Sequence, residues 1–169
     1  MATKPIVLYG DPVLREKSEP IEKIDSEIKD LVADMIATLR KAEGLGLAAN
    51  QVGVAKRVFI IETSMIDGSD EMLVCINPEI TETSGEVEYE EGCLSFPGIF
   101  ERVTRPAEAV MRATDLDGNK FERRADGLFA RALLHELDHL NGKLFIDHLS
   151  SLSRQLISKK LKKLRSEAA

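Results

Sequence analysis

Residues 131–142 read RALLHELDHLNG, with the pattern HELDH at 135–139. On a helix, side chains four positions apart lie on the same face, so the imidazoles of His135 and His139 can point at one metal ion. Glu136 can then reach a water molecule on that metal without being a ligand itself. We therefore predict a metal-binding helix at the centre of the fold.

The residues around this pattern favour a helix. Asp126 is a candidate N-cap and Asn141-Gly142 a candidate stop. Apolar residues recur between them at helical spacing: Leu128, Ala132, Leu133, Leu137 and Leu140. An ordinary amphipathic helix with two core or surface histidines would show the same pattern. A catalytic site of the zinc type also needs a third protein ligand and one open position.

Length and composition describe a globular protein. The 169 residues predict one domain, spanning 1–169, and 43% hydrophobic with 31% charged residues is typical of such domains. The net charge of −6 argues against a general nucleic-acid binder, and we expect no specific DNA partner. No apolar run has the length of a membrane span or of a signal-peptide core. We expect a cytoplasmic monomer.

Helical periodicity predicts a helix at each end of the chain. An amphipathic pattern that opens at Asp25 or Ser26 and runs through about Ala42 predicts an N-terminal helix, with Gly44 as its stop. Residues 150–166 predict a C-terminal helix, with leucines at 152, 156, 161 and 164 as its docking side. Five basic residues between 159 and 165 make this helix positive, so it is either a solvated face or a contact for RNA.

Runs of β-branched and apolar residues between the helices predict five to seven short strands. They lie at 57–61, at 72–76, which Asn77-Pro78 ends, and at 80–92, which is a strand pair or one long bent strand broken near Ser84-Gly85. A further strand at 107–115 leads through a hairpin turn at Asp117-Gly118 into KFERR at 120–124. We therefore predict an α+β fold. Short antiparallel β-strands would pack around the central metal-binding helix, with an N-terminal helix and a C-terminal helix.

The segment GLGLAANQVG, residues 44–53, superficially matches a dinucleotide-binding fingerprint. That fingerprint follows a strand and opens a helix, whereas this segment follows a helix and precedes a strand-like run. A connector rich in glycine and alanine is the simpler interpretation. Gln51 at its end carries a side-chain amide that could donate to an oxyanion.

The third ligand is easier to find upstream of the helix than downstream. Asp147 and His148 fall past the helix end and Glu167 lies in the terminal segment, so all three are poorly placed. Cys93 lies in a loop-like setting between a glycine and a Pro-Gly turn, whereas Cys75 sits in an apolar run. Cysteine with two histidines is a recognised catalytic ligand set. An inert buried Cys93 is the alternative.

Three segments together resemble the signature motifs of the peptide deformylase family, in the same order: GLGLAANQ at 44–51, EGCLS at 91–95 and HELDH at 135–139. The resemblance covers nearly the whole chain, and the second segment supplies the ligand that the third lacks. One departure is Leu134, where the family commonly has glutamine. This difference removes a possible hydrogen bond behind the metal ligands.

The resemblance implies a hydrolase that removes the N-formyl group from the formyl-methionine of nascent polypeptides and releases formate. Cys93, His135 and His139 would hold one Fe2+ ion, with Zn2+, Ni2+ or Co2+ as possible substitutes. Metal-bound water would attack the formyl carbon, with Glu136 as general base and then general acid.

The resemblance also implies how the substrate is held. The Gln51 side chain and the Leu94 backbone N–H would stabilise the oxyanion, and the Gly46 backbone would pair with the substrate's main chain. We expect a pocket for the methionine side chain, lined by Glu91, Leu128, Arg131 and Ala132. The partners would be formyl-methionyl nascent peptides and, through the basic C-terminal helix, the ribosome.

Two other functions fit parts of the sequence. A metallopeptidase would use the same helix to cleave internal peptide bonds, but the chain lacks that class's conventional third ligand. A structural metal site in a binding module would close the coordination with a fourth ligand, for example Cys93, His135, His139 and His148.

Overall fold

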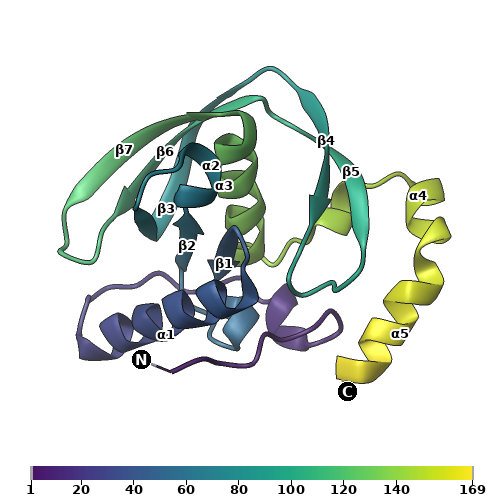
Figure 1. Ribbon diagram of the computed structural model, residues 1–169, viewed down its shortest axis with the longest axis horizontal. Coiled ribbons are helices and arrows are strands. Elements are labelled where there is room, and N and C mark those ends of the chain that lie inside the picture. The colour runs from purple at the N-terminus through teal and green to yellow at the C-terminus, as the bar shows by residue number, and fades with distance from the viewer. Residues whose placement is uncertain (1, 169) are drawn as a thin grey trace.

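The computed structural model describes residues 2–168 as two antiparallel sheets and five α-helices (Figure 1). The helices are α1 (Ser26–Ala42), α2 (Ser64–Asp67), α3 (Gly127–Leu140), α4 (Ser151–Leu156) and α5 (Ser158–Ala168), with 3-10 turns η1 (Pro12–Arg15), η2 (Ala49–Val52) and η3 (Phe145–His148). Within this described part of the chain, no helix combines the length and apolar character that a membrane crossing needs.

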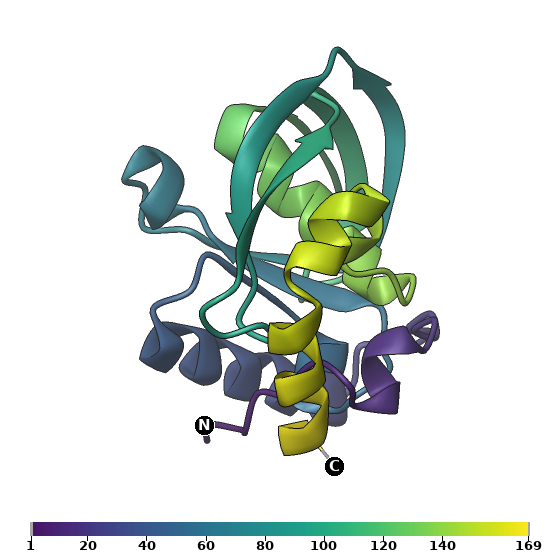
Figure 2. The same cartoon turned by 90° about the vertical axis from the view of Figure 1, so that its right-hand side faces the viewer.

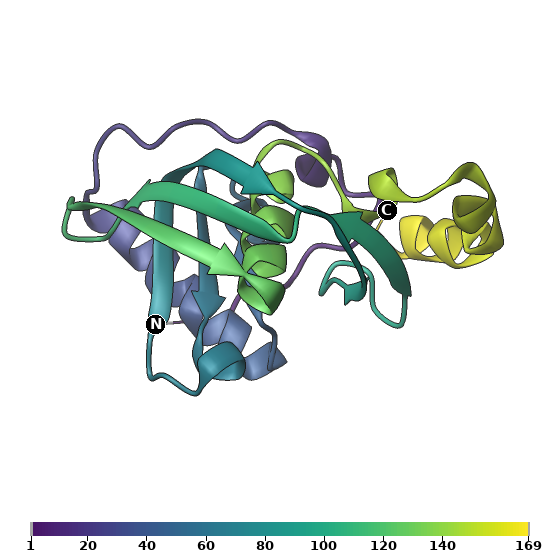
Figure 3. The same ribbon diagram turned by 90° about the horizontal axis from the view of Figure 1, so that it is seen from above.

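The larger sheet has five strands in the order β1-β2-β3-β6-β7, and β4 pairs with β5 in a separate two-stranded sheet. The strands are β1 (Gly46–Ala48), β2 (Val58–Glu62), β3 (Met72–Ser84), β4 (Val87–Gly92), β5 (Phe100–Arg105), β6 (Glu108–Thr114) and β7 (Lys120–Asp126). Figures 1 and 3 show α3 between the larger sheet and the β4–β5 pair. The predicted α+β fold, with antiparallel strands around α3, is confirmed.

Strand β2 explains why helices cover both faces of the larger sheet. Successive side chains of a strand point to opposite faces. Val58 and Ile60 pack in the core cluster that contains the buried side of α1, whereas Phe59 and Ile61 pack in the cluster that contains α3. All four side chains have no exposed surface. The apolar run predicted at 57–61 therefore serves two cores at once.

The N-terminal helix has the predicted bounds. Asp25 caps it, because its side chain accepts a hydrogen bond from the Ile28 N–H at 3.1 Å. The helix ends at Ala42, and Glu43 rather than Gly44 adopts the left-handed conformation, with φ of 55°. The predicted end of the helix near Ala42 is thus confirmed, but Glu43 makes the turn instead of the predicted Gly44.

Helix α3, which the sequence predicts to bind a metal, also begins and ends where the sequence predicts. Asp126 precedes it, although its side chain makes no capping hydrogen bond. Gly142 follows with φ of 73°, and its N–H donates to the His139 carbonyl oxygen at 3.1 Å. A Cβ atom at Gly142 would lie 2.5 Å from the Arg15 carbonyl oxygen. The helix end is therefore packed directly against η1.

Three strand predictions need correction. Asn77-Pro78 does not end its strand, because β3 continues to Ser84 through shifts in its pairing with β6 between Ile76 and Glu79. A β-bulge tolerates the missing N–H of proline and the positive φ of Asn77, which is 50°. The segment at 44–53 is more than a connector, since it forms β1 and η2, and β5 was not predicted at all.

The predicted C-terminal helix is two helices, α4 and α5, separated at Ile157 (Figure 2). Leu161 and Leu164 are buried as predicted, but Leu152 and Leu156 are 66% and 76% exposed. The predicted docking side is therefore wrong in its first half. The buried residues at 157, 161 and 164 form one helical stripe. This stripe, and not the leucines of α4, docks the C-terminal segment on the rest of the protein.

The stripe formed by residues 157, 161 and 164 packs against a cluster of three aromatic rings. Tyr9 stacks on Phe96 with ring centroids 4.9 Å apart, and Phe96 meets Phe145 edge-on at 5.0 Å. Arg165 of α5 donates a hydrogen bond to the Tyr9 hydroxyl at 2.7 Å. The tail is thus built into the core that supports the loop after β4, which contains Phe96.

We predict that Gly142→Ala destabilises the protein more than Gly118→Ala. Both glycines have positive φ, but a Cβ at Gly118 meets nothing within 4 Å. The conformational penalty of about 1–2 kcal/mol is common to both, and the collision with the Arg15 carbonyl should add about 1–3 kcal/mol at Gly142. Urea unfolding of the two metal-free variants measures the difference. Equal losses would contradict the close packing of α3 on η1.

Candidate metal centre

Three ligand-type side chains meet beside the loop that joins β4 to β5. Cys93 comes from the turn after β4, and His135 and His139 come from one face of α3. Their ligand atoms all lie within 4.8 Å of one another, and the Cys93 Sγ is 3.4 Å from the His139 Nε2. Among residues 2–168, no other group of His, Cys, Asp or Glu converges in this way. The structure therefore brings together the three predicted ligands.

The donor set fits a metal ion. Burial lowers the pKa of His139 well below its usual value, so its imidazole stays neutral, as ligation requires. The Nδ1 atom of His139 is buried and has no hydrogen-bond partner in the described residues, while its Nε2 faces Cys93. His148 is not part of the group, because its Nε2 lies 2.7 Å from Asp138. A closed site with His148 as fourth ligand is thus not formed.

Glu91, at the end of β4, orients the first histidine. Its Oε1 lies 2.8 Å from the His135 Nδ1, which leaves the Nε2 of that ring for a metal. Arg105 donates to the same carboxylate at 2.6 and 3.0 Å, and Arg131 donates a further hydrogen bond. Burial would raise the pKa of Glu91, but the hydrogen bonds from His135 and Arg105 outweigh it and hold that pKa at about 2. Glu91 therefore stays ionised.

Arg105 is a residue that the sequence analysis missed. Besides Glu91 it binds Asp138 of α3, with 2.9 Å between its NH1 and the Asp138 Oδ2. Burial alone would lower the pKa of the Arg105 guanidinium, but the contacts with Glu91 and Asp138 outweigh burial and raise that pKa above its ordinary value. Arg105 therefore stays charged. A signal was present in β5, where Val103 and Arg105 alternate onto the buried face.

Glu136 lies beside the ligands on α3 and has the properties of a general base. Its side chain is buried, and its Oε1 has no hydrogen-bond partner in the described part of the chain. Burial raises its pKa to about 7, although the charges of His135 and Arg105 oppose the shift. A Cβ at Gly46 would lie 2.8 Å from the Glu136 Oε2. The glycine thus leaves the carboxylate room beside β1.

The Gln51 side chain faces the ligand group from η2. Its Oε1 accepts a hydrogen bond from the Ala48 N–H at 3.0 Å. This bond turns the amide oxygen away from the ligand group, so the amide nitrogen faces Cys93. Its Nε2 donates to the Ser95 Oγ at 3.1 Å and lies 3.5 Å from the Cys93 Sγ. The Leu94 N–H donates to no acceptor within residues 2–168. Two hydrogen-bond donors therefore lie next to Cys93.

Asn50 was also missed, and it contacts the other side of the ligand group. It has no exposed surface, and its Nδ2 donates to the backbone oxygen of His139. Adjacent residues of η2 thus hold two different ligands in place. Asn50 binds the end of α3, and Gln51 binds the loop that contains Cys93. A buried amide in a glycine- and alanine-rich segment is a weak sequence signal.

A cavity of about 450 Å³ opens beside the ligands. The four residues predicted for the pocket all line it: Glu91, Leu128, Arg131 and Ala132. The Arg131 guanidinium is not free, because it also donates to the carbonyl oxygens of Val103 and Val87 at 2.9 and 2.8 Å. Further walls that the sequence analysis missed come from Leu45, Phe96, Pro97 and Phe100.

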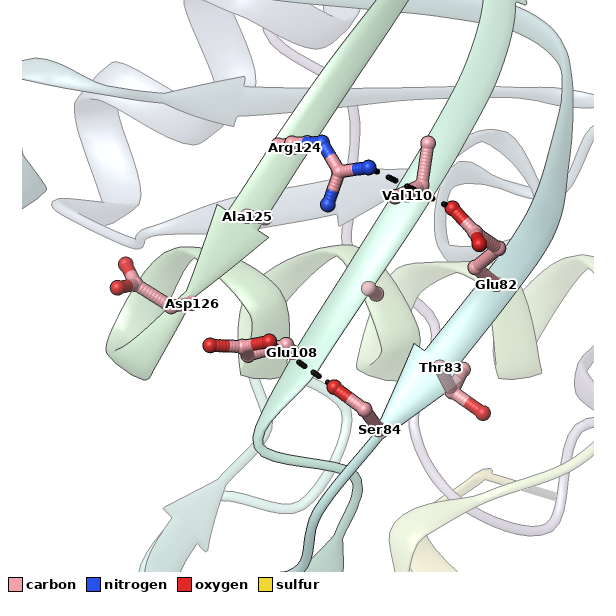
Figure 4. Close-up of a pocket in the computed structure, with 9 residues that line it drawn as sticks. Glu82, Thr83, Ser84, Glu108, Val110, Arg124, Ala125 and Asp126 are labelled. Atoms are coloured by element: carbon pink, nitrogen blue, oxygen red, sulfur yellow. Dashed lines mark hydrogen bonds and ion pairs between the residues drawn. The ribbon is translucent and has the colours of Figure 1, made fainter.

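A second hollow lies on the outer face of β3, β6 and β7, with α3 behind the sheet (Figure 4). Four of its polar side chains form two pairs. Arg124 lies 3.6 Å from Glu82, and the Ser84 hydroxyl donates to Glu108 at 2.9 Å. The hollow contains no convergent ligand group, so the chemistry belongs to the cavity beside Cys93.

We predict that Glu91→Gln destabilises the protein by roughly 3–5 kcal/mol, because it leaves the buried guanidinium of Arg131 without its counter-charge and Arg105 with Asp138 alone. Glu88→Gln is a matched control in the same strand. Glu88 pairs with Arg102 at 2.7 Å, but both side chains are more than half exposed. That loss should be below about 1 kcal/mol. Urea unfolding of the metal-free variants compares them, and similar losses would refute the structural role of the Glu91 network.

Comparison with known proteins agrees with this geometry. Residues 3–155 match the family model described as polypeptide deformylase. A peptide deformylase of Mesorhizobium japonicum is 45% identical over 100% of this chain and 97% of its own length. A peptide deformylase of Cellvibrio japonicus is 48% identical over 96% of each chain.

Solved structures give the same result at the level of the fold. The crystal structure of a peptide deformylase from Legionella pneumophila has a TM-score of 0.90 and 42% identity, over 98% of this chain and 96% of that one. The peptide deformylase from Thermus thermophilus has a TM-score of 0.90 and 38% identity, over 98% of this chain and 99% of that one. Sequence, fold and site therefore agree, and this hydrolase belongs to the polypeptide deformylase family.

Proposed function

We propose that the protein removes the N-formyl group from the formyl-methionine that begins nascent polypeptides, releasing formate. The observation that carries this proposal is the convergence of Cys93, His135 and His139 beside the buried Glu136, in a chain of this family. The other two functions have less support. A metallopeptidase lacks its downstream ligand, and a closed structural site lacks His148.

We infer that the three ligands hold one Fe2+ ion per chain, with Zn2+, Ni2+ or Co2+ as substitutes. One thiolate and two imidazoles suit these ions, and the thiolate makes the site sensitive to oxidation. Such an ion lowers the pKa of a water molecule and polarises a carbonyl group.

The cavity suits a peptide that begins with formyl-methionine. Leu128 and Ala132 give one wall an apolar surface for the methionine side chain. Strand β1 is at the edge of its sheet, so backbone groups near Gly46 are available to the main chain of an extended peptide. This mode of binding brings the formyl group toward the ligands.

Glu136 and the neighbouring donors then have distinct tasks. Glu136 takes a proton from the attacking water, and a carboxyl whose pKa is about 7 can do this near neutral pH. The formyl oxygen becomes an oxyanion, which accepts hydrogen bonds from the Gln51 side chain and the Leu94 N–H. Glu136 passes its proton to the methionine nitrogen as the C–N bond breaks, so the products are formate and a free amine.

We propose that the protein acts as a monomer with one catalytic domain and that α5 contacts the ribosome. Its inner residues Leu161 and Leu164 are buried against the body of the protein. Its lysines at 159, 160, 162 and 163 are all exposed. Positive charge on the outside of an acidic protein favours contact with ribosomal RNA.

We predict that Glu136→Ala retains the metal but lowers formate release from formyl-Met-Ala by at least about 10²-fold, since general acid–base catalysis is lost. His139→Ala should lose metal and activity together. Glu88→Gln, far more exposed and outside the cavity, should keep both. Metal content and formate release are measured on anaerobically purified protein. Substantial turnover by Glu136→Ala would rule out Glu136 as the base.

We predict that changing the lysines at 159, 160, 162 and 163 to glutamine weakens co-sedimentation with ribosomes at low salt. Substitution is preferable to deletion, because removing α5 would expose buried core residues. The matched control changes four other exposed lysines, at 17, 23, 29 and 41, to glutamine and so removes the same charge. If the two variants lose binding equally, net charge rather than α5 is responsible.

A further inference from the structure

His148 is the one histidine outside the ligand group, and it ends a chain of hydrogen bonds that begins at that group. It lies at the end of η3, with its side chain 35% exposed. Its Nε2 is 2.7 Å from the Asp138 Oδ2, and the same oxygen accepts from the Arg105 NH1 at 2.9 Å. One carboxylate oxygen therefore joins an accessible imidazole to a buried guanidinium.

The remaining steps reach the metal ligand. Arg105 donates to Glu91 at 2.6 and 3.0 Å, and Glu91 lies 2.8 Å from the His135 Nδ1. The Arg105 and Glu91 side chains are only 4% and 5% exposed. Because water screens such buried groups poorly, a change of charge at one end is transmitted to the other.

We propose that His148 is a positioning residue for the metal site. Through Asp138 and Arg105 it sets how strongly Glu91 holds His135, so metal retention responds to a proton taken up outside the active cavity. This inference rests on the metal site of the proposed function, but not on the identity of the reaction.

The direction of the response follows from the charges. A carboxylate only accepts hydrogen bonds, so the neutral His148 donates its Nε2–H to Asp138. A proton on His148 adds positive charge, so the imidazolium binds the Asp138 carboxylate more strongly. The same carboxylate then binds Arg105 more weakly. Arg105 then binds Glu91 more strongly, and Glu91 becomes a weaker acceptor for the His135 Nδ1–H. His135 becomes a poorer ligand, and the metal leaves faster.

The other charged groups around His148 keep their charge where an imidazole titrates, between roughly pH 5 and 8. Burial would raise the pKa of Asp138, but His148 and Arg105 hold it below its usual value. Asp147, the neighbour in the chain, likewise has its pKa held low by its hydrogen bond with Arg15, despite burial.

Two arginines complete this surrounding. Arg15 of η1 lies 2.6 Å from Asp147, and Arg154 of α4 lies 3.9 Å from the same carboxylate. The hydrogen bond with Asp147 raises the pKa of Arg15 above its ordinary value, so this guanidinium keeps its charge.

The test compares Co2+-loaded wild type with His148→Gln, which keeps a donor for Asp138 but cannot be protonated. Release of Co2+ to a chelator is followed from pH 5.5 to 8.0 by the visible absorption of the Co2+–thiolate group. At pH 5.5 the wild type should lose Co2+ about three- to tenfold faster than His148→Gln, below the 10–100-fold effect of removing an outer partner entirely. At pH 8.0 the two rates should agree within about twofold.

Two further variants separate this role from a general loss of structure. Asp138→Asn breaks the chain of hydrogen bonds, so adding His148→Gln to it should no longer change the pH response. Thermal unfolding of the metal-free proteins checks that wild type and His148→Gln are equally stable. A ratio of release rates that is the same at all pH values would overturn the proposal. Failure to bind Co2+ at all would instead overturn the metal site, and binding without formate release would overturn the proposed reaction alone.

Discussion

The buried carboxylate of Glu91 is the constraint on which the site depends. An ionised group in the interior is tolerated only where opposite charges and hydrogen-bond donors surround it. Its partners come from two elements, Arg105 from β5 and both Arg131 and His135 from α3. Satisfying this one charge therefore fastens the β4–β5 pair to α3. Since Cys93 follows Glu91 by two residues, the same contact delivers the thiol to the histidines.

A second point of attachment fixes the opposite side of the ligand group. The turn η2 projects Asn50 and Gln51 in different directions, one to the His139 backbone and one to the Ser95 hydroxyl. Both side chains are neutral amides, so they bring dipoles but no net charge to the ligand group. The ligands are thus held by an ionic network from one side and by neutral hydrogen bonds from the other. This division leaves Glu136 as an ionisable group with an unpaired buried oxygen.

Sequence reasoning was strongest where the signal is local. The spacing of apolar residues located α1 and α3, and the pattern around His135 together with the loop setting of Cys93 pointed to the three side chains that converge in the structure. It failed where contacts join distant positions. Asn50 is 89 residues from its partner His139, and nothing in its own surroundings announces that contact. Arg105 was missed because β5 was missed, and without the strand its inward side could not be known. The division of the C-terminal helix depends on which of its residues pack against the cluster of Tyr9, Phe96 and Phe145. That packing is a tertiary contact, which the local sequence does not reveal.

The packing of α5 on the Tyr9–Phe96–Phe145 cluster also has a consequence for how the chain folds as it is made. Phe96 stands three residues after Cys93, and the Phe145 ring lies 6.1 Å from the His135 ring. Synthesis runs from the N-terminus, so α5 emerges after every other described element. Until it does, the aromatic support behind the ligands has one side open to water. The ligand group therefore reaches its final rigidity only after α5 has been made and has packed.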